Sequence, residues 1–195
     1  MREITQRRKE RIHSVLNRRQ KDLTLIMDNI HDPHNVSAIM RSCDAFGVTR
    51  ILLYYTTEPF PDLGRKSSAS AIKWVDTESY TDPRAMLEPL RESGYQILAA
   101  GFGPEAKALP EWDLTLPTAV IFGHEHRGAS PELAQLTDRE VYIPMQGMIQ
   151  SLNVSVAAAV SLYEAWRQRS SKGMYQTPSL DEETREAMYR DWCQR

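Results

Sequence analysis

The feature that most constrains this chain is an alternation of short apolar segments with longer amphipathic ones. The short segments are rich in Val, Ile and Leu, which predicts strands at 23–30, 49–56, 95–100, 118–122 and 140–143. The intervening segments predict helices at 3–20, 36–46, 82–93, 154–169 and 181–193, and a short helix that begins at Ser130–Pro131. Strands that alternate with helices favour an α/β fold with a mainly parallel sheet.

Polar loops follow four of the predicted strands. In open α/β sheets, ligands bind at the carboxyl ends of the strands, so we expect a binding site among these loops. The first loop ends at Asn35, which we expect to cap a helix that Gly47 terminates. The four loops are His31–Asn35, Gly101–Pro104, Gly123–Gly128 and Met145–Asn153.

The distribution of charge is more informative than its sum. The 195 residues carry a formal net charge of −2, which by itself does not indicate a nucleic-acid partner. Residues 1–21, however, hold eight Lys/Arg against two Asp/Glu, whereas residues 22–164 hold ten against nineteen. A basic N-terminal arm on an acidic body is typical of a phosphate-binding footprint. A solvated surface helix is the alternative interpretation.

The two cysteines, Cys43 and Cys193, lie in no metal-ligand spacing and do not predict a disulfide framework, which suits a reducing cytoplasm. The N-terminus is charged and has no apolar segment, so we expect no secretory signal. No apolar run approaches the roughly 18–20 residues that span a bilayer, so we expect no membrane partner.

One alternative is a dinucleotide fold. Gly101-Phe-Gly103-Pro-Glu-Ala106 matches G-x-G-x-x-[GA] after a predicted strand, and Glu125 lies near the distance expected for a ribose-binding acid. The match is weak, because the motif should follow the first strand of the fold and open a helix. Pro110 leaves little room for such a helix.

A metal site is the other alternative. His31 and His34, and His124 and His126, could supply imidazole ligands, with Asp32 and Glu125 between them. No H-E-x-x-H motif or cysteine ligand supports this arrangement, so we expect no bound metal.

Three further segments stand out: Asn29–Gly47 (NIHDPHNVSAIMRSCDAFG), Ile121–Gly128 (IFGHEHRG) and Ile143–Ala159 (IPMQGMIQSLNVSVAAA). They resemble the three motifs of the SpoU-type methyltransferases of the SPOUT superfamily. They occur in order and at suitable spacing, and chance does not readily produce three such matches. The second motif departs from the family's usual pattern at His126–Arg127.

The flanking segments resemble the TrmH branch of this family. They are Arg18–Thr24 before the first motif and Glu164–Arg169 after the third. The resemblance implies an S-adenosylmethionine-dependent enzyme that methylates the ribose 2′-hydroxyl of guanosine 18 in the tRNA D-loop. Another tRNA or rRNA nucleotide, or a non-catalytic RNA-binding factor, remains the alternative.

The resemblance also implies a particular fold, domain organisation and oligomeric state. We expect a SPOUT α/β knot, a deep trefoil in which the chain passes through a loop near residues 120–165. We expect a basic N-terminal helical extension at 1–21, the catalytic domain at 22–169 and a C-terminal helical extension at 170–195. The helix at 154–166 is more broadly apolar than packing on one sheet requires, and in relatives such helices form a homodimer.

The resemblance assigns the methyl donor to the knot. Small residues permit close backbone approach, and backbone N–H and C=O groups can bind adenine without charged side chains. Glu125 would shape this site or act across the dimer interface. The expected cofactor-binding residues are Ala100, Gly101, Gly123, Glu125, Ile143, Met145 and Leu152.

The expected catalytic residues are Asn35, Arg41, Ser151 and Asn153. Arg41 matches the family's essential arginine and lies off the apolar stripe of its helix; we expect it to bind phosphate and position the hydroxyl, because an arginine side chain is a poor base. A surface ion pair with Asp44 is the alternative role for Arg41. Helix capping is the alternative for Asn35, and turn or capping chemistry for Ser151 and Asn153.

Contacts to the tRNA backbone are expected from basic residues in three segments. They would position the RNA rather than read its sequence. Trp74, Trp112 and Trp166 are expected in the core or an interface and not as base-stacking platforms. The expected RNA-binding residues are Arg8, Arg11, Arg19, Arg65, Lys66, Arg167 and Arg169.

Overall fold

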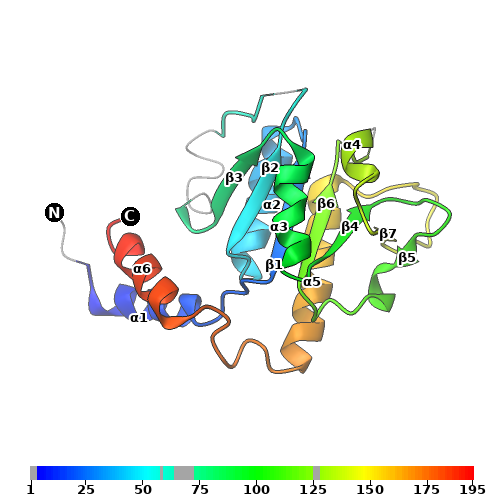
Figure 1. Ribbon diagram of the computed structural model, residues 1–195. Coiled ribbons are helices and arrows are strands. Elements are labelled where there is room, and N and C mark those ends of the chain that lie inside the picture. Colours follow the sequence, from blue (N-terminus) through cyan, green and yellow to red (C-terminus); the bar gives the residue numbers. More distant parts are fainter. Residues whose placement is uncertain (1–3, 58, 64–72, 125–127) are drawn as a thin grey trace.

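A parallel sheet forms the centre of the protein. The computed structural model describes residues 4–57, 59–63, 73–124 and 128–195. Within these residues seven strands pair in the order β3-β2-β1-β6-β4-β7-β5, and every ladder between them is parallel (Figure 1). The strands are β1 (Leu23–Asp28), β2 (Arg50–Tyr54), β3 (Asp76–Tyr80), β4 (Gln96–Ala100), β5 (Lys107–Ala108), β6 (Thr118–Phe122) and β7 (Arg139–Tyr142).

Helices cover both faces of the sheet. Helices α2 and α5 lie behind it in Figure 1 and pack against each other, whereas α3 lies in front. Apolar residues on each side form separate core clusters, so the fold has three layers. The helices are α1 (Gln6–Leu16), α2 (Pro33–Ala45), α3 (Pro83–Glu92), α4 (Pro131–Ala134), α5 (Val154–Ser171) and α6 (Glu182–Trp192), with a 3-10 turn at Leu109–Glu111.

The central strands read as continuous apolar runs because both of their faces are buried. All six residues of β1 and all five of β6 are buried. Ile26 pairs in register with Leu52 on one side and Ile121 on the other, and the three side chains share the core cluster on the α3 face. Leu25 faces the opposite cluster, under α2 and α5.

The start of α2 corrects one expectation. Asp32, and not Asn35, caps this helix: its Oδ1 accepts a 2.8 Å hydrogen bond from the backbone N–H of His34. Pro33 suits the first turn because its φ is already helical and it has no N–H to satisfy. Asn35 therefore lies inside the first turn, where it is 8% exposed. Gly47 follows the helix at φ +82°, as expected for a helix terminator.

Two strands were not predicted. Strand β3 reads Asp-Thr-Glu-Ser-Tyr and lies at the edge of the sheet, so it lacks the apolar signal of a buried strand. Strand β5 has only two residues, at the opposite edge. The remaining predicted strands and helices are present, with boundaries that differ by a few residues.

The two ends of the chain meet beside the sheet. Helices α1 and α6 pack together (Figure 1, left), where Ile12, Leu16 and Trp192 form a small apolar cluster. Trp74, from the segment before β3, meets Trp192 edge-on with ring centroids 5.0 Å apart. Among the described helices, none is both long and apolar enough to cross a membrane.

Candidate active site

A cavity of about 660 Å³ opens where β4, β6 and β7 end. The loops after these strands supply its walls, and the loop after β7 leads directly into α5. This is the edge of the sheet at which the sequence predicts a ligand. Six of the seven expected cofactor-binding residues line the cavity, namely Ala100, Gly101, Gly123, Ile143, Met145 and Leu152.

Backbone packing explains the glycine at the end of β6. A Cβ atom on Gly123 would overlap the carbonyl group of Gly128, so a side chain here would force the loop apart. The backbone N–H of Gly128 donates a 2.9 Å hydrogen bond to the carbonyl oxygen of His124 and closes this loop. Glu125, the seventh expected cofactor residue, lies outside the described residues.

The glycines after β4 adjoin a carboxylate that the sequence interpretation missed. The backbone N–H of Gly103 donates to Oε2 of Glu140, which projects from β7 and lines the cavity. Residues 101–106 lead into β5 and not into a helix, so the dinucleotide alternative is wrong. The Gly-x-Gly spacing reflects close packing against Glu140.

Asn35 and Asn153 meet beside the cavity. Asn153 caps α5, because its Oδ1 accepts hydrogen bonds from the backbone N–H groups of Ser155 and Val156. Its Nδ2 donates a 3.0 Å hydrogen bond to Oδ1 of Asn35. Ser151 lines the cavity two residues earlier and is exposed. The fold therefore brings three of the four expected catalytic residues to one region.

Arg41 is exposed on α2. Within the described chain it makes no hydrogen bond or ion pair, and it does not line the cavity. The alternative role is wrong, because Asp44 pairs with Arg19 instead. Arg41 lies six residues beyond Asn35, or about 9 Å along the helix axis. Its guanidinium group is therefore exposed and free to bind a ligand.

A buried carboxylate supports the same edge of the sheet. Asp28, at the end of β1, is 1% exposed and accepts hydrogen bonds from the side chain of Asn29 at 2.8 Å and the backbone N–H of Ser130 at 2.5 Å. Burial raises the pKa of Asp28, and these hydrogen bonds oppose the shift. Asn29 holds φ +49°, and its Oδ1 accepts 3.0 Å hydrogen bonds from the N–H groups of Thr56 and Thr57. These hydrogen bonds tie together the segments that follow β1, β2 and β6.

Comparison with known proteins agrees with this geometry. Residues 22–163 match the SpoU rRNA Methylase family. This chain belongs to that family. It is 45% identical over 195 residues to the tRNA (guanosine(18)-2′-O)-methyltransferase of Thermus thermophilus, and the match covers 100% of both chains.

Two solved structures of SpoU proteins extend the comparison. The TrmH/SpoU tRNA modifying enzyme of A. aeolicus has a TM-score of 0.90 and 40% identity, covering 96% of this chain and 95% of that one. The SpoU methyltransferase AviRb from Streptomyces viridochromogenes, in complex with AdoMet, has a TM-score of 0.68 and 26% identity, covering 88% and 67%. The expected fold class, a SPOUT α/β knot with a mainly parallel sheet, is confirmed.

Two arginines that we expected to bind RNA are buried in this SpoU protein. Arg19 is 0% exposed, pairs with Asp44 at 2.5 Å and donates to the carbonyl oxygens of Val48 and Trp74. Arg169 is also 0% exposed; it pairs with Asp22 at 2.5 Å and donates to Gln20 and to the carbonyl oxygens of Leu114 and Leu116. Because neither arginine can reach a phosphate, the expectation that Arg19 and Arg169 bind RNA is wrong.

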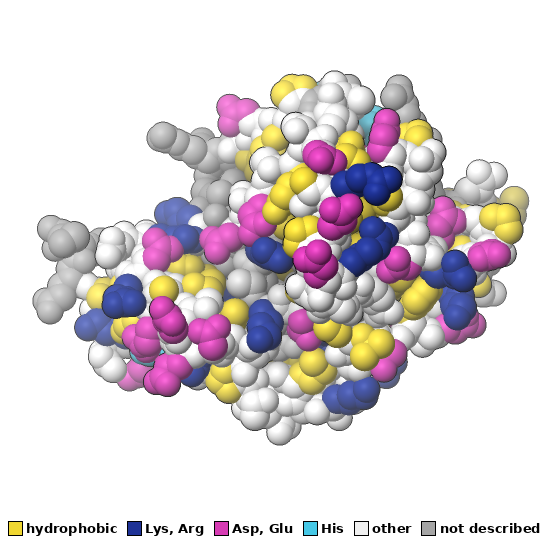
Figure 2. Space-filling view, viewed as in Figure 1, with side chains coloured by type: hydrophobic (Ala, Val, Ile, Leu, Met, Phe, Trp, Pro, Cys, Tyr) yellow, Lys and Arg dark blue, Asp and Glu magenta, His cyan; other side chains and the backbone are white. Residues whose placement is uncertain are grey.

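The other expected RNA contacts differ in their surroundings. Arg8 and Arg11 are exposed on α1. Arg167 is exposed but forms two hydrogen bonds with the carboxylate of Glu164, at 2.7 and 2.8 Å. Figure 2 shows Lys and Arg side chains interspersed with Asp and Glu over this face of the molecule, so no single basic patch dominates it. Arg65 and Lys66 lie outside the described residues.

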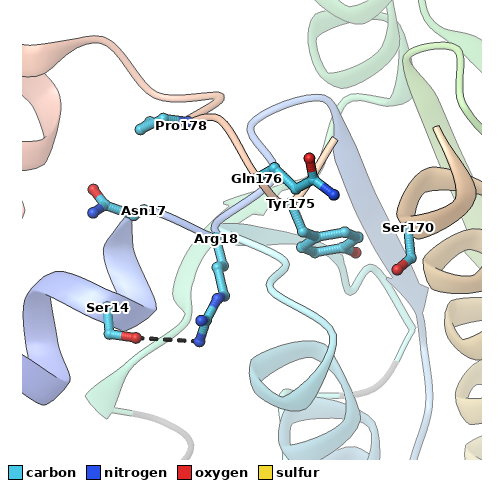
Figure 3. A pocket seen from close by; sticks show the side chains of 7 residues that line it. All are labelled: Ser14, Asn17, Arg18, Ser170, Tyr175, Gln176 and Pro178. Carbon is cyan, nitrogen blue, oxygen red and sulfur yellow. Dashed lines mark hydrogen bonds between the residues drawn. The ribbon is translucent and has the colours of Figure 1, made fainter. Parts of the chain in front are cut away.

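A second cavity, of about 580 Å³, lies between the end of α1 and the segment before α6 (Figure 3). Arg18 is the charged residue among its lining side chains, and it donates a 3.1 Å hydrogen bond to Ser14. Tyr175 also lines this cavity, and its hydroxyl donates to the carbonyl oxygen of Phe46, just beyond α2. Asn35 lies at the other end of α2, so this cavity is separate from the first.

The described part of the chain offers no metal site at the histidines that suggested one. Among the described residues, no group of three or more His, Cys, Asp or Glu side chains could hold a metal ion. His31, His34 and His124 belong to this part of the chain, and His126 lies outside it.

Proposed function

We propose that this protein is an S-adenosylmethionine-dependent methyltransferase that methylates the ribose 2′-hydroxyl of guanosine 18 in the tRNA D-loop. The observation that carries the proposal is that two features lie next to each other. One is the cavity lined by the loops at the ends of β4, β6 and β7, and the other is the hydrogen-bonded pair Asn35–Asn153. The full-length similarity to a tRNA (guanosine(18)-2′-O)-methyltransferase supports the target.

The cavity suits S-adenosylmethionine. Its volume of about 660 Å³ falls within the range of about 300–1,000 Å³ that is usual for small-molecule sites. Apolar side chains of Phe122, Val141 and Leu152 can contact adenine, while Gly101 and Gly123 leave backbone groups accessible for hydrogen bonds. We assign the cofactor to this cavity, with Ala100, Ile143 and Met145 completing its walls. When bound there, S-adenosylmethionine supplies an electrophilic methyl group.

Arg41 and the asparagine pair provide the remaining functions. The exposed guanidinium of Arg41 can bind an RNA phosphate through paired N–H donors and so fix the ribose. Asn35 and Asn153 hold the starts of α2 and α5 together, which places Ser151 at the edge of the cavity. Such positioning can lower the activation free energy by about 7–11 kcal/mol in well-oriented reactions, because the orientational entropy is lost on binding and not in the chemical step.

We also propose that the protein is a homodimer. Val156, Val160, Tyr163 and Trp166 lie on α5 at helical spacing and are 36–51% exposed. With Ala38 and Ser42 of α2, the first three of them line an apolar groove. This face is where the broad apolar surface of the 154–166 helix remains uncovered in one chain. Light scattering tests the dimer: V160E should yield monomers, and a dimeric V160E would contradict this interface.

The helical extensions are proposed to contact the tRNA backbone. We divide the chain into an N-terminal extension (1–21), a catalytic domain (22–169) and a C-terminal extension (170–195), as the sequence predicts. Arg8 and Arg11 are exposed on α1, and Arg18 lines the second cavity. A cytoplasmic location suits a tRNA-modifying enzyme with free cysteines, and fractionation of cells that express the protein tests it.

A defined transcript tests the target nucleotide. We expect labelled methyl transfer to a tRNA transcript with guanosine at position 18, and none to the same transcript with 2′-deoxyguanosine there, because the acceptor hydroxyl is missing. Equal labelling of the two transcripts would overturn the assignment to this nucleotide.

A further inference from the structure

Glu140 occupies an unusual place in the cofactor cavity. It projects from β7 between two glycines of the loop after β4. A Cβ atom on Gly101 would lie 2.6 Å from Oε1 of Glu140, and a Cβ atom on Gly103 would overlap its Oε2. The carboxylate thus fills the space that side chains at both positions would need. Close packing against the backbone of these glycines therefore fixes the position of the Glu140 carboxylate.

One carboxylate oxygen of Glu140 remains available. Oε2 accepts the hydrogen bond from the N–H of Gly103, whereas Oε1 has no hydrogen-bond partner in the described part of the chain. The neighbouring cation is engaged elsewhere, since Arg139 pairs with Glu105 at 3.7 Å. A half-buried carboxylate that lines a ligand cavity, and that has no cationic partner among the described residues, favours a ligand that donates hydrogen bonds.

We propose that Glu140 binds the ribose cis-diol of the cofactor, accepting hydrogen bonds from its hydroxyl groups. The inference rests on the proposed function, which places S-adenosylmethionine in this cavity. The ribose offers two adjacent O–H donors and no negative charge. The methionine end carries an ammonium group but also a carboxylate, which Glu140 would repel. The diol is therefore the better partner for a carboxylate held against the two glycines of one loop.

Glu140 is thereby a cofactor-specificity residue that lies outside the three sequence motifs. A site that hydrogen-bonds a ligand hydroxyl discriminates against the analogue that lacks it, because the acceptor is left without its donor. E140Q should weaken this discrimination. If the glutamine oxygen keeps the hydrogen bond from Gly103, its amide N–H₂ faces the ribose and can only donate to the hydroxyl oxygens, so the hydroxyls lose their charged acceptor and keep at most a weaker neutral hydrogen bond.

Calorimetric titration without RNA tests the proposal. The ligands are S-adenosylhomocysteine, its 2′-deoxy and 3′-deoxy analogues, and methylthioadenosine, which keeps the ribose but lacks the amino acid. We expect wild-type protein to bind the ribose form at least about tenfold more tightly than a deoxy analogue, the ratio for one hydrogen bond to a charged group. E140Q should narrow this ratio to less than about threefold.

Two comparisons complete the test. E105Q is the matched control, because Glu105 is 78% exposed at its side chain and does not line the cavity; it should keep the wild-type ratio. The weakening caused by E140Q should persist with methylthioadenosine. Thermal unfolding should show E140Q to be folded, and E140D offers a second variant that keeps the acceptor but shortens its reach.

Three results would overturn the inference. An unchanged ribose preference in folded E140Q and E140D would show that Glu140 does not contact the diol. Loss of the E140Q effect with methylthioadenosine would place the contact at the methionine ammonium group. If wild-type protein bound none of these ligands, the cofactor site itself would be wrong, which is distinguishable because affinity would be absent before any substitution.

Discussion

Asn153 donates a 3.0 Å hydrogen bond from its Nδ2 to Oδ1 of Asn35, joining residues that lie 118 positions apart in the chain. The same Asn153 side chain uses its Oδ1 to cap α5. One side chain therefore fixes the start of α5 and links it to the first turn of α2. Because Ser151 and the cavity wall lie directly before this cap, the pair determines the geometry of the proposed transfer site.

The two functions of Asn153 can be separated by substitution. N153D should retain the cap, because aspartate is as good an N-cap as asparagine, and its stability should stay near wild type. It should lose most methyl transfer, since a carboxylate replaces the donor that faces Asn35. N153A should lose activity and also about 1 kcal/mol of stability. Chemical unfolding and methyl-transfer assays measure the two effects, and an active N153D variant would contradict this account of the pair.

Arg41 should matter for transfer and not for folding. R41A should remove nearly all methyl transfer but leave the unfolding free energy within about 0.5 kcal/mol of wild type, because Arg41 is exposed and without a partner in the described chain. Cofactor affinity, measured by calorimetry, should be largely kept. R41K should recover little activity, since lysine cannot form the paired contact with a phosphate. Full activity of R41A would eliminate the proposed role.

Arg169 should matter for folding. R169M leaves the carboxylate of Asp22 without its partner, and breaking a buried pair in this way costs about 3–5 kcal/mol. R167M is the matched control on the same helix: Arg167 forms an exposed pair with Glu164, so its loss should cost less than about 1 kcal/mol. Urea unfolding compares the two, and equal costs would be inconsistent with a structural role for Arg169.

Arg8 and Arg11 should contact RNA without stabilising the fold. R8A and R11A should each weaken tRNA binding across sequences and reduce the slope of log affinity against log salt by about 1. R84A, an exposed arginine on α3 with only a 3.9 Å ion pair, serves as the control. Filter binding at several salt concentrations measures the slopes. Unchanged slopes in both α1 variants would exclude this helix from the phosphate contacts.

Asp28 should give stability an identifiable pH dependence. Burial raises its pKa above the ordinary value of 3.8, so the folded state binds this proton more tightly than the unfolded chain. The resulting stabilisation is fully present below that ordinary value and is lost as the pH rises through the raised pKa. The free-energy advantage of wild type over D28N should therefore shrink as the pH rises from about 4 towards 7. Urea unfolding of both proteins across this range tests the sign, and an advantage that grows with pH would refute it.

Sequence patterns predicted the interior of this fold better than its edges. β1 and β6 are evident because both faces are buried, whereas β3 is a polar edge strand whose pairing with β2 leaves no apolar signal. The cap of α2 was misassigned because Asp32 and Asn35 are both good capping residues. Pro33 distinguishes them, because a proline at the first helical position makes the residue before it, Asp32, the N-cap.

Sequence also indicates charge without showing its burial. Arg19 and Arg169 sit in basic segments, yet their partners Asp44 and Asp22 lie 25 and 147 positions away, so no local pattern reveals the pairs. Glu140 was missed for a similar reason. The Gly101-x-Gly103 spacing carried the signal, but the carboxylate that requires it comes from another strand. Six lining residues of the cavity were predicted: Gly123, Ile143, Met145 and Leu152 lie in the motifs, whereas Ala100 and Gly101 follow from the family resemblance alone.

Mapping the methylated atom tests the proposed methyl transfer to guanosine 18 most directly. Purified protein is incubated with an unmodified tRNA transcript and labelled S-adenosylmethionine, and the RNA is then digested with nuclease and analysed by mass spectrometry. We expect the label on the ribose of guanosine 18 in the D-loop. A label on another tRNA nucleotide, or on rRNA alone, would contradict the target, and absence of transfer to any RNA by folded protein would contradict the proposed activity.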